Sequence, residues 1–219
     1  MKRLLFIILL FLCASMVCPS IAFSQKIEKV DTVINMTEYV SYYSYSISAP
    51  SFVIYKLYKG GGDVSRSGMS FKEMKDIYGK KIPHFNYTKS GYDRGHLCNA
   101  EDMAWSKESL KRTFYYINVI PQHPELNREN WKYNEQMVRY VSQNDSLIIV
   151  CGGCDWKGQI PQNCFKVVYS LTDGACIESI IYTNNAYQTY KTSDKLKKVF
   201  PYKTLKQMWN GKRMKKFQK

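Results

Sequence analysis

The sequence predicts an α+β domain with a mixed, mainly antiparallel central sheet. Strand-like and helix-like segments follow one another without the regular alternation of a doubly wound fold. Asp173-Gly174 separates two strand-like runs and predicts a tight turn between neighbouring antiparallel strands. No internal repeat, low-complexity tract or Pro/Gly-rich linker divides the chain. We therefore expect one domain, residues 25–219, which is long enough to bury a core.

Four segments have the composition of strands, because they are rich in β-branched and aromatic residues. Gly60-Gly61-Gly62 follows the first of them, and we expect it to end that strand. We likewise expect Gly152-Gly153 to end the second, which is a short apolar run. The four segments are residues 52–58, 146–151, 165–171 and 177–182.

Two segments predict helices. The first runs over residues 106–116, with Ser106 as the N-cap. The second runs from about residue 126 to 141, where Asn127, Trp131, Glu135 and Arg139 recur every four residues and so share one slowly drifting face. One interpretation is an exposed face with a Glu135–Arg139 ion pair worth only ~0.3–0.5 kcal/mol. The other is a functional face on which the Trp131 ring lies beside the polar groups of Asn127, Glu135 and Arg139.

Residues 1–24 have the pattern of a secretory signal peptide. Lys2 and Arg3 precede an uncharged run of 14 residues, Leu4 to Val17, and small residues at Ala22 and Ser24 suit a signal peptidase. The run is shorter than the ~20 residues that span a bilayer. We expect export, to a periplasm or the exterior, and no stable membrane association; an uncleaved anchor and a lipoprotein signal at Cys18 are the alternatives.

The chain is strongly basic. Its net charge is +14, or +12 once Lys2 and Arg3 are removed. Residues 191–219 contain eleven Lys or Arg and a single acid, Asp194. Such a chain is drawn to polyanions such as nucleic acid, acidic polysaccharide or anionic lipid. The alternative is that the lysines only keep the protein soluble.

Five cysteines follow the predicted leader: Cys98, Cys151, Cys154, Cys164 and Cys176. Export permits disulfides, and an odd number leaves one thiol over. A Cys154–Cys164 bridge across a loop is the preferred pairing, although the full pairing stays open. Only one C-x-x-C motif occurs, and the three histidines lack ligand spacing, so a zinc site is not expected.

The segment Asp93-Arg94-Gly95-His96 combines three kinds of chemistry. Histidine exchanges protons near neutral pH. Arginine presents a planar fork of donors that suits phosphate oxygens. Gly95 permits a close approach of the backbone because it has no Cβ. A surface turn with one ion pair is the alternative for these four residues taken alone.

The motifs around this tetrad resemble those of the DNA/RNA non-specific endonucleases, the ββα-metal nucleases of the endonuclease G type. The resemblance covers about residues 50–182, and its most specific part lies between Tyr87 and Arg139. The tetrad alone matches easily by chance, but the tetrad with the two later motifs at these separations does not. The matching elements are Ser90 to Leu97, Asp102-Met103, Phe114, Asn118-x-x-Pro121-Gln122, Asn127 and Trp131-x-x-x-Glu135, with Arg66 upstream.

The resemblance implies a ββα-metal catalytic motif and a role for each matching residue. His96 would be the general base and Asn127 the metal ligand, with magnesium as the expected cation and manganese as the alternative. Asn118 would help to hold the histidine. Glu135 would accept hydrogen bonds from the water molecules of the metal. The candidates for clamping the substrate phosphate are Arg66, Arg94 and Arg139.

Asp93 is expected to orient the turn or Arg94, or simply to cap the turn. The resulting hypothesis is an exported, metal-dependent endonuclease that cleaves DNA, and RNA as well, with little sequence preference. A catalytically inactive nucleic-acid-binding module on the same scaffold is the alternative, and a secreted protein that binds acidic glycans is a third. Preference for DNA or RNA and for single or double strands stays open, as does the oligomeric state.

Overall fold

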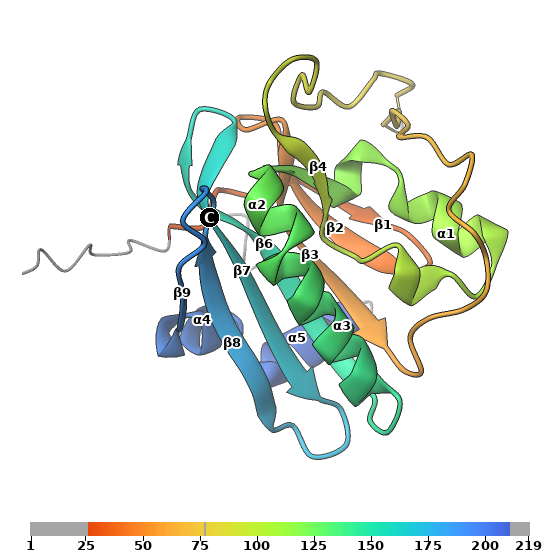
Figure 1. Cartoon of the computed structure of the whole chain (residues 1–219), viewed down its shortest axis with the longest axis vertical. Helices are drawn as coiled ribbons and strands as arrows, with labels where there is room; N and C mark the ends of the chain where they lie inside the picture. The colour runs from red at the N-terminus through yellow and green to blue at the C-terminus, as the bar shows by residue number, and fades with distance from the viewer. Residues whose placement is uncertain (1–25, 77, 211–219) are drawn as a thin grey trace, which may run out of the picture.

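A computed structural model describes residues 26–76 and 78–210. Its centre is a seven-stranded sheet in the order β1-β2-β3-β6-β7-β8-β9, in which every neighbouring pair is antiparallel (Figure 1). The α+β class with a mainly antiparallel sheet is thereby confirmed. The strands are β1 (Thr32–Asn35), β2 (Tyr39–Ser44), β3 (Ala49–Leu57), β6 (Leu147–Lys157), β7 (Ile160–Ser170), β8 (Cys176–Thr183) and β9 (Tyr190–Thr192).

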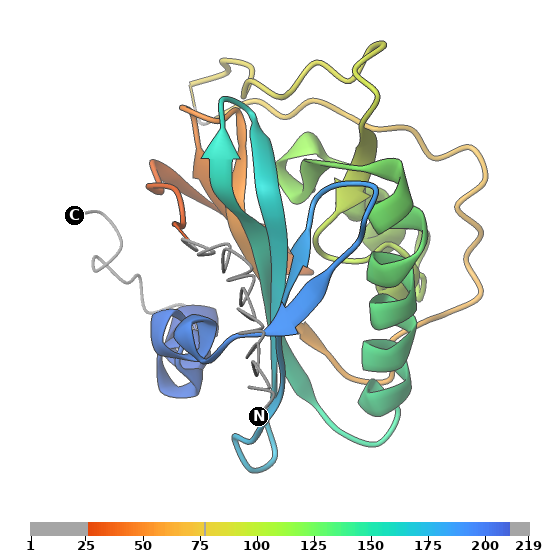
Figure 2. The same cartoon turned by 60° about the vertical axis from the view of Figure 1, so that its left-hand side comes forward.

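Helices cover both faces of this sheet, as the edge-on view in Figure 2 shows. One face carries α2, α3 and a separate two-stranded sheet of β4 and β5. The opposite face carries α4 and α5 near the C-terminal end. The helices are α1 (Lys107–Thr113), α2 (Pro124–Arg128), α3 (Asn130–Ser142), α4 (Asp194–Val199) and α5 (Tyr202–Trp209), with short 3-10 turns η1 (Glu101–Met103) and η2 (Tyr116–Asn118); β4 is Asp93–His96 and β5 is Val119–Gln122.

Each face of the sheet buries its own apolar cluster. Trp131 and Val138 of α3 pack on one face, and Leu196, Leu205 and Phe200 near α4 and α5 pack on the other. Along each strand, successive side chains point to opposite faces of the sheet, so they enter the two clusters in turn. Among the described residues, no helix combines the length and the apolar character that crossing a membrane requires. The predicted signal peptide, residues 1–24, lies outside the described residues.

Both expected helices form, but the second is divided. Ser106 caps α1 by accepting a hydrogen bond from the Ser109 backbone NH at 3.1 Å, as expected. The expected single helix from about residue 126 to 141 is wrong, because Glu129 (φ −112°, ψ −97°) leaves helical geometry between α2 and α3. Asn130 begins α3, and its side chain donates to the Gln188 carbonyl in the β8–β9 loop at 3.2 Å. Asn127 therefore lies on a different helix from Glu135.

The expectation that Gly152-Gly153 ends a strand is also wrong. β6 passes through both glycines and continues to Lys157. A Cβ at Gly152 would collide with the carbonyl oxygen of Ser51 on the neighbouring β3, and one at Gly153 would collide with the Trp156 side chain. These glycines permit close packing inside a strand, which is a different use of the missing side chain from a break.

The expected Cys154–Cys164 disulfide is absent, because all five cysteines of the described residues are free thiols. Cys154 packs in the cluster beside α4 and α5, whereas Cys164 packs in the cluster beside α3. The two side chains thus lie on opposite faces of the sheet. Cys98 is buried, also as a free thiol.

Candidate active site

The two motifs that frame the site pair with each other as β4 and β5. In this ribbon Arg94 lies opposite Pro121, and His96 lies opposite Val119. A Cβ at Gly95 would collide with the buried side chain of Gln122. The glycine of the tetrad is therefore needed for packing against the glutamine of the second motif.

His96 is held as a neutral imidazole. Its ring packs against Phe71 at 5.1 Å and Phe114 at 4.9 Å between centroids. Burial and the nearby positive charge of Arg66 lower its pKa to about 3. Its Nε2 atom is buried and meets no hydrogen-bond partner in the described part of the chain. The residue is thus unprotonated at neutral pH, and its Nε2 is left without a described partner on the side of the cavity.

Asp93 organises the neighbouring helix α2. Its carboxylate accepts a hydrogen bond from Asn127 Nδ2 at 3.0 Å and two from Arg128, at 2.9 and 2.8 Å. Burial raises the pKa of Asp93, but the hydrogen bonds from Arg128 and Asn127 outweigh it and lower the pKa overall. The expectation that Asp93 orients Arg94 is wrong, because these contacts orient Asn127 and Arg128 instead.

Glu135 is buried beside the cavity, with only 9% of its surface exposed. The interpretation of this helix as an exposed face is therefore wrong. Burial raises the pKa of Glu135 to about 7, although the positive charge of Lys166 opposes this shift.

The ion pair between Arg139 and Glu135 that an exposed helix face would make does not form; Arg139 has other partners. Its Nε donates to Asp102 at 2.7 Å, its Nη2 donates to Asn99 at 3.0 Å, and its Nη1 lies 3.0 Å from Glu101. Arg139 is thus neutralised by the η1 segment, which leaves it less suited to clamp a phosphate than the other arginines.

The remaining two predicted arginines are exposed at the rim. The Arg94 guanidinium lies over the rings of Tyr87 (5.0 Å) and Phe71 (5.5 Å), and its Nε donates to the Tyr116 hydroxyl at 3.3 Å. The Arg66 guanidinium lies 5.6 Å from the ring of Phe114. Stacking on aromatic rings restricts both side chains without neutralising their charge.

Asn118 lies behind the site. It is completely buried. Its Oδ1 accepts from the Cys98 backbone NH at 2.8 Å, and its Nδ2 donates to the carbonyls of Cys98 and Thr113, both at 2.9 Å. Since its own carbonyl accepts from the Leu97 NH at 2.9 Å, Asn118 fixes the backbone directly after His96.

These elements enclose a cavity of about 270 Å³. It brings together six of the seven predicted site residues, and Asn118 is the seventh. Five cavity residues escaped prediction: Asn99, Ala100, Glu101, Arg128 and Lys132. Arg128 directly follows Asn127 at the end of α2, and Lys132 lies in the first turn of α3. The lining residues are Arg66, Arg94, His96, Asn99, Ala100, Glu101, Asn127, Arg128, Lys132, Glu135 and Arg139.

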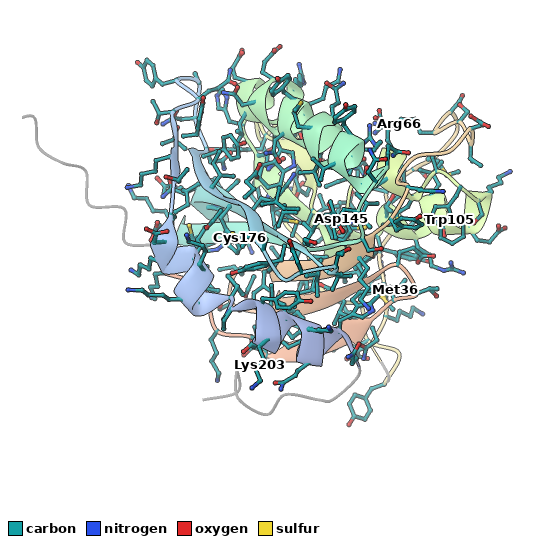
Figure 3. The ribbon with its side chains drawn as sticks, turned by 90° about the horizontal axis from the view of Figure 1, so that it is seen from below. Met36, Arg66, Trp105, Asp145, Cys176 and Lys203 are labelled. Carbon is teal, nitrogen blue, oxygen red and sulfur yellow. The ribbon has the colours of Figure 1, made fainter. Side chains whose placement is uncertain are left out.

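The cavity is positively charged and lies away from Lys203 of α5. Its lining holds five Lys or Arg side chains against two carboxylates. Figure 3 shows Arg66 and Lys203 on opposite sides of the molecule, with the sheet between them. The described lysines of α4 and α5 therefore do not line the cavity.

The donor set suits a hard cation with few protein ligands. The described residues contain no cluster of three or more His, Cys, Asp or Glu that could hold a metal ion. Asn127 donates its Nδ2 to Asp93, so its Oδ1 is the atom left for a ligand. Mg²⁺ prefers oxygen ligands and keeps several of its waters, so one amide oxygen with a nearby carboxylate fits this ion.

Relatives of known identity match parts of the chain. Mitochondrial endonuclease G of Bos taurus is 36% identical over 93 residues, which are 42% of this chain and 31% of that protein. A nuclease of Nostoc sp. is 33% identical over 140 residues, 53% of this chain and 51% of that protein. The mitochondrial nuclease of Saccharomyces cerevisiae is 31% identical over 144 residues, 63% and 44% respectively. The matched segments thus span about a third to a half of these relatives.

The fold and a family model agree with these matches. The crystal structure of an EndoG/EndoGI complex superposes with a TM-score of 0.60 and 22% identity, covering 70% of this chain and 74% of that one, which shows a shared fold. The model of the DNA/RNA non-specific endonucleases matches residues 19–212. The match covers nearly the whole chain, and the chain therefore belongs to the DNA/RNA non-specific endonuclease family.

Proposed function

We propose that the protein is a metal-dependent endonuclease that hydrolyses phosphodiester bonds of DNA and RNA with little sequence preference. One observation carries the proposal: a neutral histidine, His96, has an unpartnered Nε2 beside a cation-lined cavity. Hydrolysis of a phosphodiester needs a base for the attacking water and positive charge around the phosphate. The cavity offers both within one site.

His96 takes the proton from the attacking water at Nε2. Its low pKa keeps the imidazole unprotonated through the neutral range, so no prior deprotonation is needed. Packing between Phe71 and Phe114 fixes the ring. Asn118 holds the backbone that follows His96, which limits movement of the base relative to the cavity.

Asn127 Oδ1 would hold the divalent cation, magnesium by preference or manganese. When bound, such a cation supplies a Lewis acid for the phosphate and the leaving oxygen. Asp93 fixes the amide of Asn127 so that the oxygen is presented to the cavity. Glu135 would accept hydrogen bonds from water molecules around the cation, a supporting task for a carboxylate beside the ligand.

The exposed arginines bind the phosphate. Arg66 and Arg94 retain their charge at the rim, and Arg128 and Lys132 extend the positive surface along α2 and α3. Contacts of this kind reach the phosphate backbone, which is common to all sequences, so little sequence preference is expected.

A nicking assay tests the function. Supercoiled plasmid is incubated with the purified protein in Mg²⁺, in EDTA, and in EDTA followed by excess Mg²⁺. The proposal predicts cleavage only in the first and third reactions. An inactive nucleic-acid-binding module would retard the plasmid without cutting it, and a glycan-binding protein would do neither in a Mg²⁺-dependent way. An intact plasmid in Mg²⁺ would overturn the proposal.

We further propose that the protein is exported, on the pattern of residues 1–24. Cleavage after Ser24 would leave Gln25 as the first residue of the mature chain. N-terminal sequencing of the protein recovered from its native cells tests this, and an intact Met1 in cytoplasmic protein would contradict it.

A further inference from the structure

Lys166 is a completely buried cation in the middle of the central sheet. It lies on β7, paired with Cys151 of β6 and Ile180 of β8. Its neighbours two positions away, Cys164 and Val168, pack in the cluster under α3, so Lys166 points to that face as well. The Nζ atom lies 4.4 Å from the centre of the Trp131 ring on α3. Lys166 therefore extends from the sheet toward the helix that carries Glu135.

This ammonium lacks the hydrogen bonds that usually accompany a buried charge. No described residue accepts a hydrogen bond from Nζ. Burying a charge is costly unless it is paired, so a role in balancing other buried charges is indicated. The charge of Lys166 acts on three buried carboxyl groups. Burial raises the pKa values of Glu135, Glu178 and Asp102, and the positive charge of Lys166 opposes this rise in each of them.

The three carboxyl groups differ in their other partners. Glu178 accepts a hydrogen bond from Asn134 at 2.6 Å, and Asp102 accepts one from Arg139 at 2.7 Å. For Glu135, the charge of Lys166 is the largest influence that opposes burial, ahead of the Asn99 hydrogen bond and Arg139, while Asp102 acts in the opposite sense.

Lys166 and Glu135 differ in their relation to the cavity. Glu135 lines the cavity, whereas Lys166 does not. The Cys151 thiol beside Lys166 has its pKa raised by burial to about 12 and remains neutral, so it does not compete for the ammonium.

We propose that Lys166 is a positioning residue: packed on Trp131, one turn of α3 from Glu135, its buried charge holds the Glu135 carboxylate in place, so that Glu135 could accept hydrogen bonds from the water shell of a bound cation. This inference rests on the proposed nuclease function. A purely structural reading is that Lys166 only neutralises Glu178, and the two readings differ in what the removal of both charges would do.

Three variants separate these readings: Lys166→Met, Glu178→Gln and the double variant. Methionine retains much of the length of lysine without its charge, and the double variant leaves no uncompensated Glu178. If Lys166 serves only Glu178, the double variant behaves like wild type. If Lys166 serves Glu135, the double variant recovers its stability but not its cation affinity.

The primary readout is binding of Mn²⁺ to protein free of nucleic acid, followed by electron paramagnetic resonance, with thermal unfolding as the folding control. We expect the double variant to bind Mn²⁺ about tenfold more weakly than wild type, the lower end of the loss seen when groups that support metal sites are removed. Glu178→Gln should bind Mn²⁺ at least as tightly as wild type, because Lys166 is then shared among fewer carboxylates.

The pH profile of plasmid cleavage is the second readout. Without Lys166, Glu135 takes up a proton at higher pH, so the acid limb of the double variant should move upward. With Glu178→Gln alone, the limb should stay in place or move downward. This single variant also covers the case in which the double variant fails to fold.

Wild-type Mn²⁺ affinity and an unshifted acid limb in the folded double variant would overturn the role of Lys166, as would an upward shift in Glu178→Gln. Failure of the nuclease proposal itself looks different: wild-type protein would neither bind Mn²⁺ nor cut plasmid.

Discussion

The contact between Asp93 and Asn127 offers a sharp test of how the cation is held. Asp93 accepts from Asn127 Nδ2 at 3.0 Å, and this contact decides which end of the amide faces the cavity. In the variant Asp93→Asn, the new side chain has a single oxygen, which Arg128 competes for. Its NH2 group would face the Asn127 NH2 group, and Asn127 would relieve this conflict by turning its oxygen away from the cavity.

The expected magnitudes follow from these contacts. In the Asp93–Arg128 pair, Arg128 is largely exposed (66%), whereas Asp93 exposes 21% of its side chain. Because water screens the exposed guanidinium, loss of the pair should cost little stability. Misdirecting the ligand that holds the cation should cost roughly 10–100-fold in affinity, or about 1.4–2.8 kcal/mol. The variant is thus predicted to lose cation affinity out of proportion to stability.

Mn²⁺ titration and urea unfolding of the same preparations measure the two effects. Arg128→Ala is the matched control, because it removes the ion pair and leaves the Asp93–Asn127 hydrogen bond in place. It should bind Mn²⁺ like wild type and bind nucleic acid more weakly. Wild-type Mn²⁺ affinity in Asp93→Asn, or an equal loss in Arg128→Ala, would refute this reasoning.

Three further predictions concern the surroundings of the site. Asn118→Ala leaves the Cys98 backbone NH and carbonyl unpaired in the core and should lower the unfolding free energy by roughly 2–4 kcal/mol, measured in urea; a loss below 1 kcal/mol would contradict its bracing role. The folded protein binds a proton at His96 only near pH 3, whereas an unfolded histidine binds one below about pH 6.5. The unfolding free energy of wild type should therefore fall by about 1–2 kcal/mol more than that of His96→Gln between pH 7.5 and 5. An equal fall in the two proteins would refute the burial of a neutral imidazole. Deleting the residues after Asn210 should weaken DNA binding at low salt and leave the turnover rate unchanged, a cut that spares Leu205 in the core; unchanged affinity would show that the end of the tail does not contact nucleic acid.

The resemblance to the family, carried by short motifs, indicated most of the residues that line the cavity. His96 and Glu135 lie within such motifs, and Asn127 is a single matching position between them. The break at Glu129 could not be predicted, because the four-residue spacing continues across it and the helix end depends on contacts such as that of Asn130 with Gln188. A pattern reports which residues share a face only if the helix is continuous.

The remaining errors have a common physical origin in distant contacts. In the sequence Gly152 suggests the end of a strand, whereas in the structure it allows the close approach of Ser51 inside the sheet. Spacing pairs Arg139 with Glu135, whereas in the structure the η1 segment supplies Asp102 as its partner. Lys166 stands in an apolar strand with no local signal of its role. Each depends on a segment far away in the chain, which spacing alone does not reveal.

The direct test of the account is a comparison of wild type with His96→Ala in single-turnover cleavage of a DNA duplex, with Mg²⁺ saturating and protein in excess. Loss of a general base should slow cleavage by about 100-fold to 10,000-fold. Mn²⁺ binding and DNA binding, measured on the same preparations, should stay close to wild type because Asn127 and the arginines are untouched. Cleavage by His96→Ala at the wild-type rate would contradict the central claim that His96 is the base.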